Sequence, residues 1–287
     1  MEQDRSFLAM QWKRFQKNIF QQADGLTGAL WVNRPDAAEQ AENKLLQLQT
    51  ARELALTIPE TVFTNRAEDV RKMVRRFGRV IFKSFYPHSW QNPETGEAIG
   101  AGVALLDESS PLPEASIAMC PGIYQRYIDK AFDIRLTVIG EHYFAVKLSK
   151  GGNEAFLDWR PYSEDEQLRY EPFELPHALE QKLRAFMRQM GLVFGCIDLV
   201  IDRDGNAVFL EVNQAGQFLF VERCLPSLPL LRAMTAMLLS GRPDYRLDEC
   251  EPVRFKDFLE SDAFIRMDTA ARRKAEAEAS DLLSVES

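Results

Sequence analysis

Residues 194–213 read FGCIDLVIDRDGNAVFLEVN, and this stretch decides how the chain folds. Two apolar runs flank the Asp-Gly dipeptide at 204–205, which is a strong short-range signal for a β-hairpin. If the dipeptide is a two-residue turn, counting outward places Asp198 directly opposite Glu211. Side chains alternate along a strand, so Asn213 shares a face with Glu211. The stretch therefore predicts a hairpin that gathers two carboxylates and a carboxamide in apolar surroundings.

These oxygen-bearing side chains have two interpretations. Like charges directly opposite each other on a sheet are destabilising, and burial makes the repulsion worse unless a cation lies between them. All-oxygen ligands suit Mg²⁺, which takes water and substrate phosphates in its remaining positions. The ordinary alternative is a surface hairpin whose acids are solvated. We predict the magnesium site, with Asp198, Glu211 and Asn213 as the ligands.

The composition limits the partners. A chain of 287 residues with 46% hydrophobic and 27% charged residues is typical of a globular protein with one large domain or two. The formal net charge of -8 is not offset by a long basic run, so we expect no nucleic acid partner. The sequence has no apolar run of about 18 residues and no signal-peptide pattern, so we expect no membrane partner. Four scattered cysteines favour a reducing, cytoplasmic setting.

Several cations stand in apolar strand sequences. Lys83 ends VIFK, Lys147 ends HYFAVK, and Arg135 lies inside DIRLTVI. One such lysine is usually an edge residue whose ammonium group reaches water. Three of them, in a chain that also carries the acidic hairpin, indicate a site for a polyanion and a metal ion. Neither GxxxxGK[ST] nor GxGxxG occurs, so a P-loop and a dinucleotide-type Rossmann site are not indicated.

The sequence resembles the ATP-grasp carboxylate–amine ligases, and within them the microviridin or graspetide maturases, which macrocyclise ribosomally made peptides. The resemblance runs from about residue 31 to 241. It is carried by WVNRPDAAEQAENKLLQL, IPETVFTN, VIFK, YQRYIDKAFDIRLTVIGEHYFAVK, DWR and FGCIDLVIDRDGNAVFLEVNQAGQF. The D…E-x-N arrangement is shared by the superfamily, whereas the N-x-x-G-Q-F continuation is typical of the peptide-maturase branch.

The resemblance implies an α+β ATP-grasp fold, in which two α/β lobes hold ATP between antiparallel sheets. It predicts four segments. Residues 1–40 would be the remnant of a truncated N-terminal pre-ATP-grasp domain, and residues 41–124 the small central lobe. Residues 125–245 would be the large lobe, and residues 246–287 a C-terminal extension.

The resemblance also implies roles for individual residues, with ATP and Mg²⁺ as cofactors. The predicted metal ligands are again Asp198, Glu211 and Asn213. Two lysines of the small lobe would contact the ATP phosphates, Lys44 and Lys83. The interlobe hinge would bind adenine through Gln125, Tyr127 and Ile128. Further nucleotide contacts would come from Lys130 and Asp133. The γ-phosphate and the acyl phosphate would be held by three cations, Arg135, Lys147 and Arg160.

The implied reaction converts an Asp or Glu side chain of a precursor peptide into an acyl phosphate. A Ser or Thr hydroxyl, or a Lys amine, of the same peptide then attacks to form an ester or amide. The expected partners are the precursor peptide and, if the chain dimerises, a second copy. Two alternatives stay open: an amino-acid ligase of the glutamate-tail-adding kind, and a non-catalytic nucleotide-binding partner protein.

Overall fold

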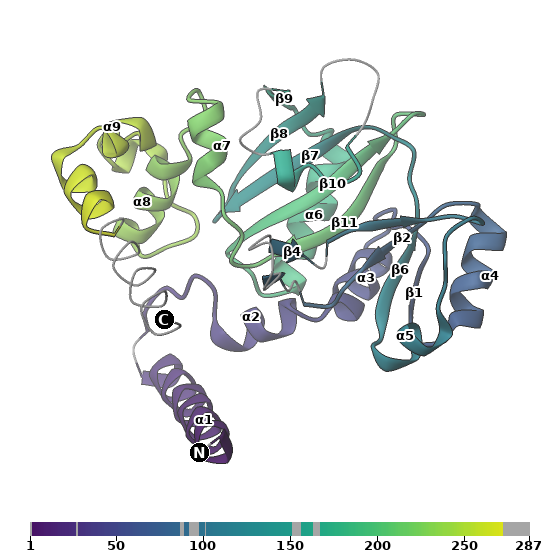
Figure 1. Cartoon of the computed structure of the whole chain (residues 1–287). Coiled ribbons are helices and arrows are strands. Elements are labelled where there is room, and N and C mark those ends of the chain that lie inside the picture. Colours follow the sequence, from purple (N-terminus) through teal and green to yellow (C-terminus); the bar gives the residue numbers. More distant parts are fainter. Residues whose placement is uncertain are drawn as a thin grey trace.

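The computed structural model of the chain describes residues 2–26, 28–86, 89–91, 98–100, 102–150, 156–162 and 167–271. Two antiparallel sheets lie in two lobes, with helices packed on them (Figure 1). The predicted α+β class with paired antiparallel sheets is confirmed. No helix of the described part is long and apolar enough to cross a membrane.

The small lobe is built on a four-stranded sheet with the order β1-β6-β2-β5. Its elements are β1 (Thr61–Thr64), α4 (Ala67–Phe77), β2 (Val80–Lys83), β5 (Ala104–Leu106), α5 (Glu114–Met119) and β6 (Gly122–Arg126). Val70, Met73 and Val74 recur at helical spacing and bury one face of α4 against the sheet. Gly78, with a φ of 73°, ends α4. A separate two-stranded sheet pairs β3 (Ser89–Gln91) with β4 (Ala98–Gly100).

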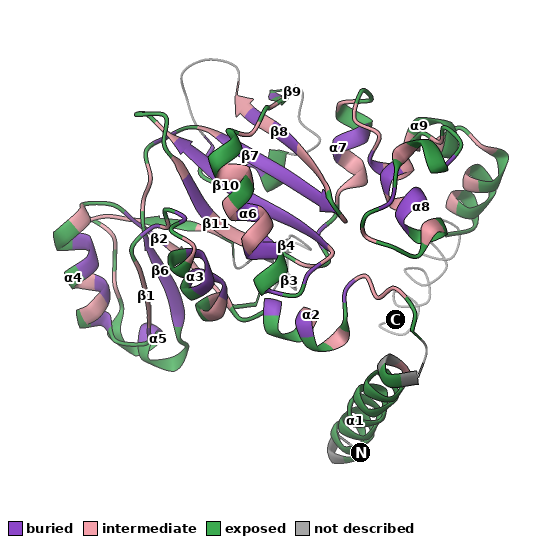
Figure 2. Ribbon diagram, turned by 180° about the vertical axis from the view of Figure 1, so that it is seen from behind, coloured by how far each residue is buried: buried purple, intermediate pink, exposed green. Residues whose placement is uncertain are grey.

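The large lobe is built on a five-stranded sheet with the order β11-β10-β7-β8-β9. Its strands are β7 (Lys130–Ile139), β8 (His142–Lys150), β9 (Leu168–Pro172), β10 (Phe194–Asp202) and β11 (Ala207–Asn213). One face is covered by α6 (His177–Gln189), α2 (Pro35–Ala41) and α3 (Lys44–Glu53). Figure 2 shows the central strands β7 and β10 largely buried behind α6. Leu183 and Phe186 of α6 and Leu48 of α3 fill this core.

The second face of the same sheet packs against the C-terminal helices near one end. These are α7 (Leu219–Cys224), α8 (Leu230–Ser240) and α9 (Phe255–Leu259), with the short 3₁₀ helices Arg160–Tyr162 and Leu247–Glu249. Ile139 and Phe194 of the sheet meet Leu230 and Met237 of α8 in a second core. The part of this face that carries Asp198 lines a cavity to which the small lobe also contributes.

The lobe boundaries predicted from the sequence differ from the packing at one place. Residues 41–124 were expected to form the small lobe, but α3 packs against the large sheet, where Leu48 and Ala51 are buried with Phe209. The small sheet itself begins at Thr61. The division of the chain into independent domains stays a prediction. Residues 272–287 of the expected C-terminal extension lie outside the described residues.

The N-terminal helix α1 (Glu2–Leu26) projects from the rest of the molecule (Figure 1). It is joined to the body by an ion pair from Lys17 to Glu39 of α2, at 2.8 Å. An edge contact between the rings of Phe20 and Trp31 supports the same end of the helix. Most of the apolar side chains of α1 are exposed.

The hairpin formed by β10 and β11 places Asp198 opposite Glu211, as predicted, but by a different route. The amide of Gly205 donates to Asp202, and the amide of Asp202 donates to Asn206, so residues 203–205 form a three-residue loop. Gly205 takes the positive φ of 85° that this loop requires. A bulge next to Asp198 then adds one residue to β11 and restores the predicted pairing. The predicted two-residue turn was wrong. The longer loop shifts the register of the strands by one residue, and the bulge shifts it back at Asp198.

The bulge also changes which side chains of β11 share a face. Simple alternation put Phe209 beside Glu211, but Phe209 is buried against Phe186 of α6, with ring centroids 4.8 Å apart. Leu210 and Glu211 both line the cavity on the opposite face. An extra residue interrupts the alternation at that point, so the predicted face was wrong for Phe209 and correct for Glu211.

Glu222 joins the three C-terminal helices. Its side chain on α7 is buried and accepts the amide of Leu231 in α8 at 2.6 Å and that of Phe255 in α9 at 2.7 Å. We expect Glu222→Ala to lower the free energy of unfolding by roughly 1–3 kcal/mol, because both helix starts lose their acceptor. Urea unfolding measures this. Glu260→Ala, an exposed glutamate at the end of α9, is the control, and an equal effect in both variants would contradict the capping role.

Candidate active site

A cavity lies between the two sheets. It has an empty volume of about 650 Å³, including the part open to solvent. Strands β2 and β6 of the small lobe and β7, β10 and β11 of the large lobe contribute to its walls. The predicted site residues among its lining are Lys83, Gln125, Tyr127, Ile128, Lys130, Asp133, Arg160, Asp198 and Glu211. One cavity thus brings together residues that are up to 128 positions apart in the sequence.

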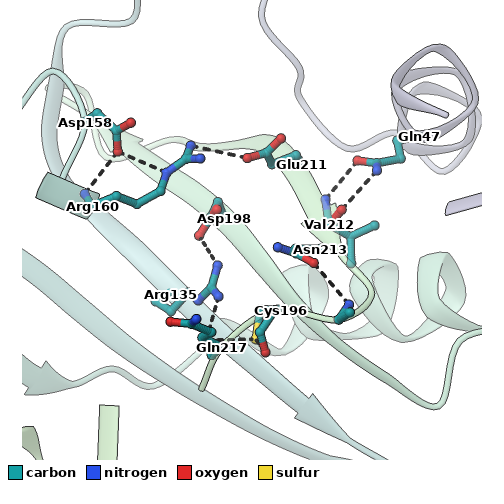
Figure 3. Close-up of polar contacts among 12 residues, drawn as sticks. Gln47, Arg135, Asp158, Arg160, Cys196, Asp198, Glu211, Val212, Asn213 and Gln217 are labelled. Carbon is teal, nitrogen blue, oxygen red and sulfur yellow. Dashed lines mark hydrogen bonds and ion pairs between the residues drawn. The ribbon is translucent and has the colours of Figure 1, made fainter. Parts of the chain in front are cut away.

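Three neighbouring strands carry charged residues in one row (Figure 3). Asp198 of β10 lies opposite Glu211 of β11 on one side and opposite Arg135 of β7 on the other. The Arg135 guanidinium donates to Asp198 Oδ1 at 2.9 Å, and it also donates to the carbonyl of Gln217 at 2.9 Å. Both members of the Arg135–Asp198 pair are buried. The isolated cation in DIRLTVI therefore contacts the acidic hairpin directly, while its predicted role at a phosphate stays a prediction.

Glu211 is surrounded by cations from three different segments. Lys44 of α3 lies 2.9 Å from one carboxylate oxygen, and an Arg160 guanidinium nitrogen lies 3.4 Å from the other. Burial is the largest influence and acts to raise the pKa of Glu211, but Lys44, Lys83 and Arg160 together hold it well below its usual range. Burial also lowers the pKa of the Lys83 ammonium group, which Glu211 opposes. Glu211 is therefore a carboxylate at neutral pH.

Arg160 is oriented by a second acid. Its Nε and its backbone amide both lie 3.1 Å from Asp158 Oδ1, so the side chain folds back towards the sheet (Figure 3). This geometry places one guanidinium between Asp158 and Glu211. A planar guanidinium with several fixed donors is well suited to hold a phosphate as well as a carboxylate.

Asn213 completes the predicted metal ligands. It is exposed at the end of β11, and its Oδ1 accepts the amide of Ala215 at 3.1 Å. Asp198, Glu211 and Asn213 all line a second cavity, which opens beside the first. Their five side-chain oxygens are hard donors that fit Mg²⁺, and the donor set leaves positions for phosphate and water. The surrounding cations balance the two carboxylates in the structure as it stands.

No protein-family model matches the sequence, and no curated protein matches it. Solved structures do. The macrocyclase MdnC from Microcystis aeruginosa MRC, bound with the precursor peptide MdnA, is 25% identical with a TM-score of 0.70, over 82% of this chain and 72% of that chain. The macrocyclase MdnB from the same organism is 28% identical with a TM-score of 0.66, over 83% of this chain and 71% of that chain. The chain has the ATP-grasp fold and is similar to these peptide macrocyclases.

A third structure agrees with this fold. The RiPP-associated ATP-grasp ligase of Chryseobacterium gregarium, in complex with ADP and a leader and core peptide, has a TM-score of 0.73 at 20% identity. The match covers 86% of this chain and 73% of that chain. The sequence-based resemblance to the ATP-grasp maturases is thereby confirmed at the level of the fold.

The predicted adenine hinge lies where the ATP-grasp lobes join. Gln125 of β6 is buried and donates to Thr61 Oγ1 at 3.1 Å. The amide of Tyr127 donates to the carbonyl of Arg79, whose guanidinium lies 4.1 Å from the Tyr127 ring centroid. The backbone of Ile128 makes no hydrogen bond to another described residue, although it lines the cavity. Its amide and carbonyl are therefore free to meet a base edge.

Lys130 and Asp133 form a buried ion pair at the large-lobe end of this hinge. Lys130 Nζ lies 2.7 Å from Asp133 Oδ1 and 3.5 Å from the carbonyl of Leu157. Burial raises the pKa of Asp133 to about 6, and Lys130 limits the shift. The pair lines the cavity, so a nucleotide that binds there changes its surroundings.

This pKa gives a pH-dependent stability. The folded value of about 6 lies above the usual 3.8, so the folded state binds the proton more tightly than the unfolded state. The free energy of unfolding should then fall as pH rises from 4 through 6, by roughly 1–3 kcal/mol. Asp133→Asn has no carboxyl group to titrate at this position, so its stability should lack this dependence on pH. The difference in free energy of unfolding between wild type and variant, measured by urea unfolding, should therefore change by about 1–3 kcal/mol between pH 4 and 6. Parallel curves would contradict burial as the cause.

Lys147 is the one predicted site residue that the structure places elsewhere. It pairs in register with Ile134, whose side chain lies in the core beneath α6, so Lys147 lies on the face opposite to Arg135. Its ammonium group lies 2.8 Å from Glu171 and 5.1 Å from the Phe132 ring centroid. The structure does not bring Lys147 to the site, because strand residues point alternately to opposite faces.

Several residues around the site were assigned no role from the sequence. Trp159 is buried with its ring 5.6 Å from the Arg135 guanidinium, and Asp158 orients Arg160. The second cavity adds α7, which supplies Phe220 and Arg223. These residues lie in a loop and a short helix without periodicity. Only the DWR tripeptide, quoted for its family resemblance, pointed to this part of the wall.

Proposed function

We propose that the chain is an ADP-forming ligase that cross-links a precursor peptide. The observation that carries this proposal is the row of Arg135, Asp198 and Glu211, which lies where two cavities meet. The first cavity is lined by Ile128 of the hinge and by Lys83, which could contact the base and the phosphates of a nucleotide. The second is lined by three guanidinium groups and is open to a larger substrate.

ATP fits the first cavity with adenine at the hinge and phosphates towards the carboxylates. The free backbone of Ile128 would meet the base, and Lys83 would meet the phosphates from the small lobe. Lys44 and Arg160 surround Glu211 and would contact phosphate oxygens from either side. Phosphoryl transfer needs mainly positioning and charge stabilisation, which fixed cations in a partly desolvated cavity supply.

Asp198, Glu211 and Asn213 would hold Mg²⁺. When bound, the ion offsets negative charge on the β- and γ-phosphates. The protein contributes the fixed spacing of the oxygens, and the hydrogen bond from Arg135 holds the Asp198 carboxylate in the row. We leave Lys147 out of the site because it lies on the other face of the sheet.

The second cavity would receive the peptide. Arg160, Arg223 and Arg135 line it, so an Asp or Glu side chain can approach the γ-phosphate there. The carboxylate oxygen attacks phosphorus, the bond to the bridging oxygen breaks, and ADP leaves. A Ser or Thr hydroxyl, or a Lys amine, then attacks the acyl carbon. The carbon–oxygen bond to phosphate breaks, phosphate and a proton leave, and an ester or amide remains.

The relatives support a peptide as the acceptor. MdnC was solved bound with the precursor peptide MdnA, and the Chryseobacterium gregarium ligase with ADP and peptides. We infer the same substrate class for this chain, because its second cavity is lined by Asp198 and Glu211 and has an empty volume of about 1060 Å³, including the part open to solvent.

The test uses the full chain, Mg·ATP and a synthetic peptide. The peptide copies a short precursor that is encoded beside the gene and that carries both an acidic residue (Asp or Glu) and a nucleophilic one (Ser, Thr or Lys). The expected result is peptide-dependent ADP release, with the loss of one water mass per bond formed. A gain of mass on an acceptor would instead identify a tail-adding ligase. ADP formed with free amino acids only, or thermal stabilisation by Mg·ATP without any ADP, would overturn the cross-linking proposal.

A further inference from the structure

The outer edge of β11 is held by a side chain from α3. β11 is the edge strand of the large sheet, so its outward backbone groups have no neighbouring strand. Gln47 is 1% exposed and meets this edge with both ends of its amide. Its Oε1 accepts the amide of Val212 at 2.9 Å, and its Nε2 donates to the Val212 carbonyl at 3.0 Å (Figure 3).

The position of this contact matters because Val212 separates Glu211 from Asn213. The amide of Phe209 donates to the carbonyl of Thr57 at 2.8 Å on the same edge. The bulge that turns Glu211 into the cavity therefore lies between two fixed points, Phe209 and Val212. A bulged strand is locally unpaired and depends on such contacts for its direction.

The same helix touches the side chain as well as the backbone. Lys44, one turn before Gln47 on α3, forms the 2.9 Å ion pair with Glu211. Gln47 also donates to the carbonyl of Ala41, which ties its amide to the end of α2. These partners fix the orientation of the Gln47 side-chain amide. Rotating the amide away from Val212 would break buried hydrogen bonds and so cost free energy.

We propose that Gln47 is a positioning residue for the oxygens of Glu211 and Asn213. It acts through the backbone of Val212 and touches neither substrate nor metal. The inference rests on the proposed function, since it concerns the cation that those oxygens would hold. Ligand oxygens need fixed directions, and loss of an outer hydrogen bond commonly weakens metal affinity by about 10–100-fold.

The test compares Gln47→Met with Gln49→Met. Methionine keeps the length of the side chain and removes both bonds to Val212. Gln49 is exposed on the same helix, and its side chain donates a hydrogen bond to Glu53 on that helix. Mn²⁺ replaces Mg²⁺ as the probe, and electron paramagnetic resonance counts the free ion in the presence of ADP. We expect Gln47→Met to weaken Mn²⁺ binding about tenfold or more, and Gln49→Met to leave it unchanged.

Two further measurements separate positioning from general destabilisation. ADP binding without divalent metal should be the same in all three proteins, because the hinge is untouched. A folded Gln47→Met protein that binds Mn²⁺ like wild type overturns the inference, whatever its melting temperature. If wild type itself binds no Mn²⁺ with ADP, the proposed function fails instead.

A second variant covers the case in which Gln47→Met does not fold. Gln47→Glu keeps an acceptor for the Val212 amide and loses the bond donated to the Val212 carbonyl. It should weaken Mn²⁺ binding less than Gln47→Met and more than Gln49→Met. Wild-type Mn²⁺ affinity in folded Gln47→Glu would overturn the inference as well.

Discussion

Glu211→Gln is expected to reduce peptide-dependent ADP formation by roughly 10³-fold or more. The substitution keeps the size of the side chain and removes the negative charge that Lys44, Lys83 and Arg160 surround. The cation cluster then gains net positive charge. ADP without metal should therefore bind as well as before or more tightly, while turnover is lost because one proposed metal oxygen is gone.

This divergence between binding and turnover is what distinguishes a metal ligand from a structural acid. Glu171→Gln is the matched control, since Glu171 is also paired with a lysine on the same sheet but on its other face. Turnover and calorimetric ADP binding are measured for both variants, and circular dichroism checks the fold. Turnover of Glu211→Gln within about threefold of wild type would remove the metal assignment.

The hairpin shows what a sequence can and cannot specify. The pairing of Asp198 with Glu211 was predicted from the Asp-Gly turn, and the structure has it. The prediction used a two-residue turn, whereas Gly205 ends a three-residue loop and a bulge compensates. Hydrophobic alternation sets the register of a buried strand strongly, so the acids reach the same face by either route. The bulge itself has no signal in the local sequence.

Lys147 shows how a count along the sequence can weigh against an assigned role. The Gly140-Glu141 turn pairs Ile139 with His142, and counting from it places Lys147 opposite Ile134 rather than opposite Arg135. Family resemblance assigned the role without this count. Gln47 represents the opposite case. Its contact with Val212 joins residues 165 positions apart, and no sequence pattern near either residue predicts it. Such contacts depend on how α3 docks, which no local pattern determines.

Arg135→Met is expected to give the second large effect. The substitution removes the 2.9 Å bond to Asp198 and leaves that carboxylate buried beside Glu211 without its cation. Breaking a buried pair from one side typically costs about 3–5 kcal/mol in the free energy of unfolding. Turnover should fall by roughly 10²–10³-fold. Mg·ADP should recover part of the lost stability, because Asp198 then has a cation again.

Lys147→Met makes this prediction decisive, because the two cations lie on adjacent strands and differ in the face they occupy. The Lys147–Glu171 pair has side chains 32% and 54% exposed, so its loss should cost at most about 1 kcal/mol. Turnover should stay within about threefold of wild type. Urea unfolding and ADP release measured on both variants test the comparison. If Lys147→Met lost turnover as Arg135→Met does, with its stability unchanged, the lysine would have to reach the phosphates, and the face assigned to β8 would be wrong. If only Arg135→Met is inactive, then Arg135 belongs to the site and Lys147 does not, as the alternating direction of side chains along β7 and β8 predicts.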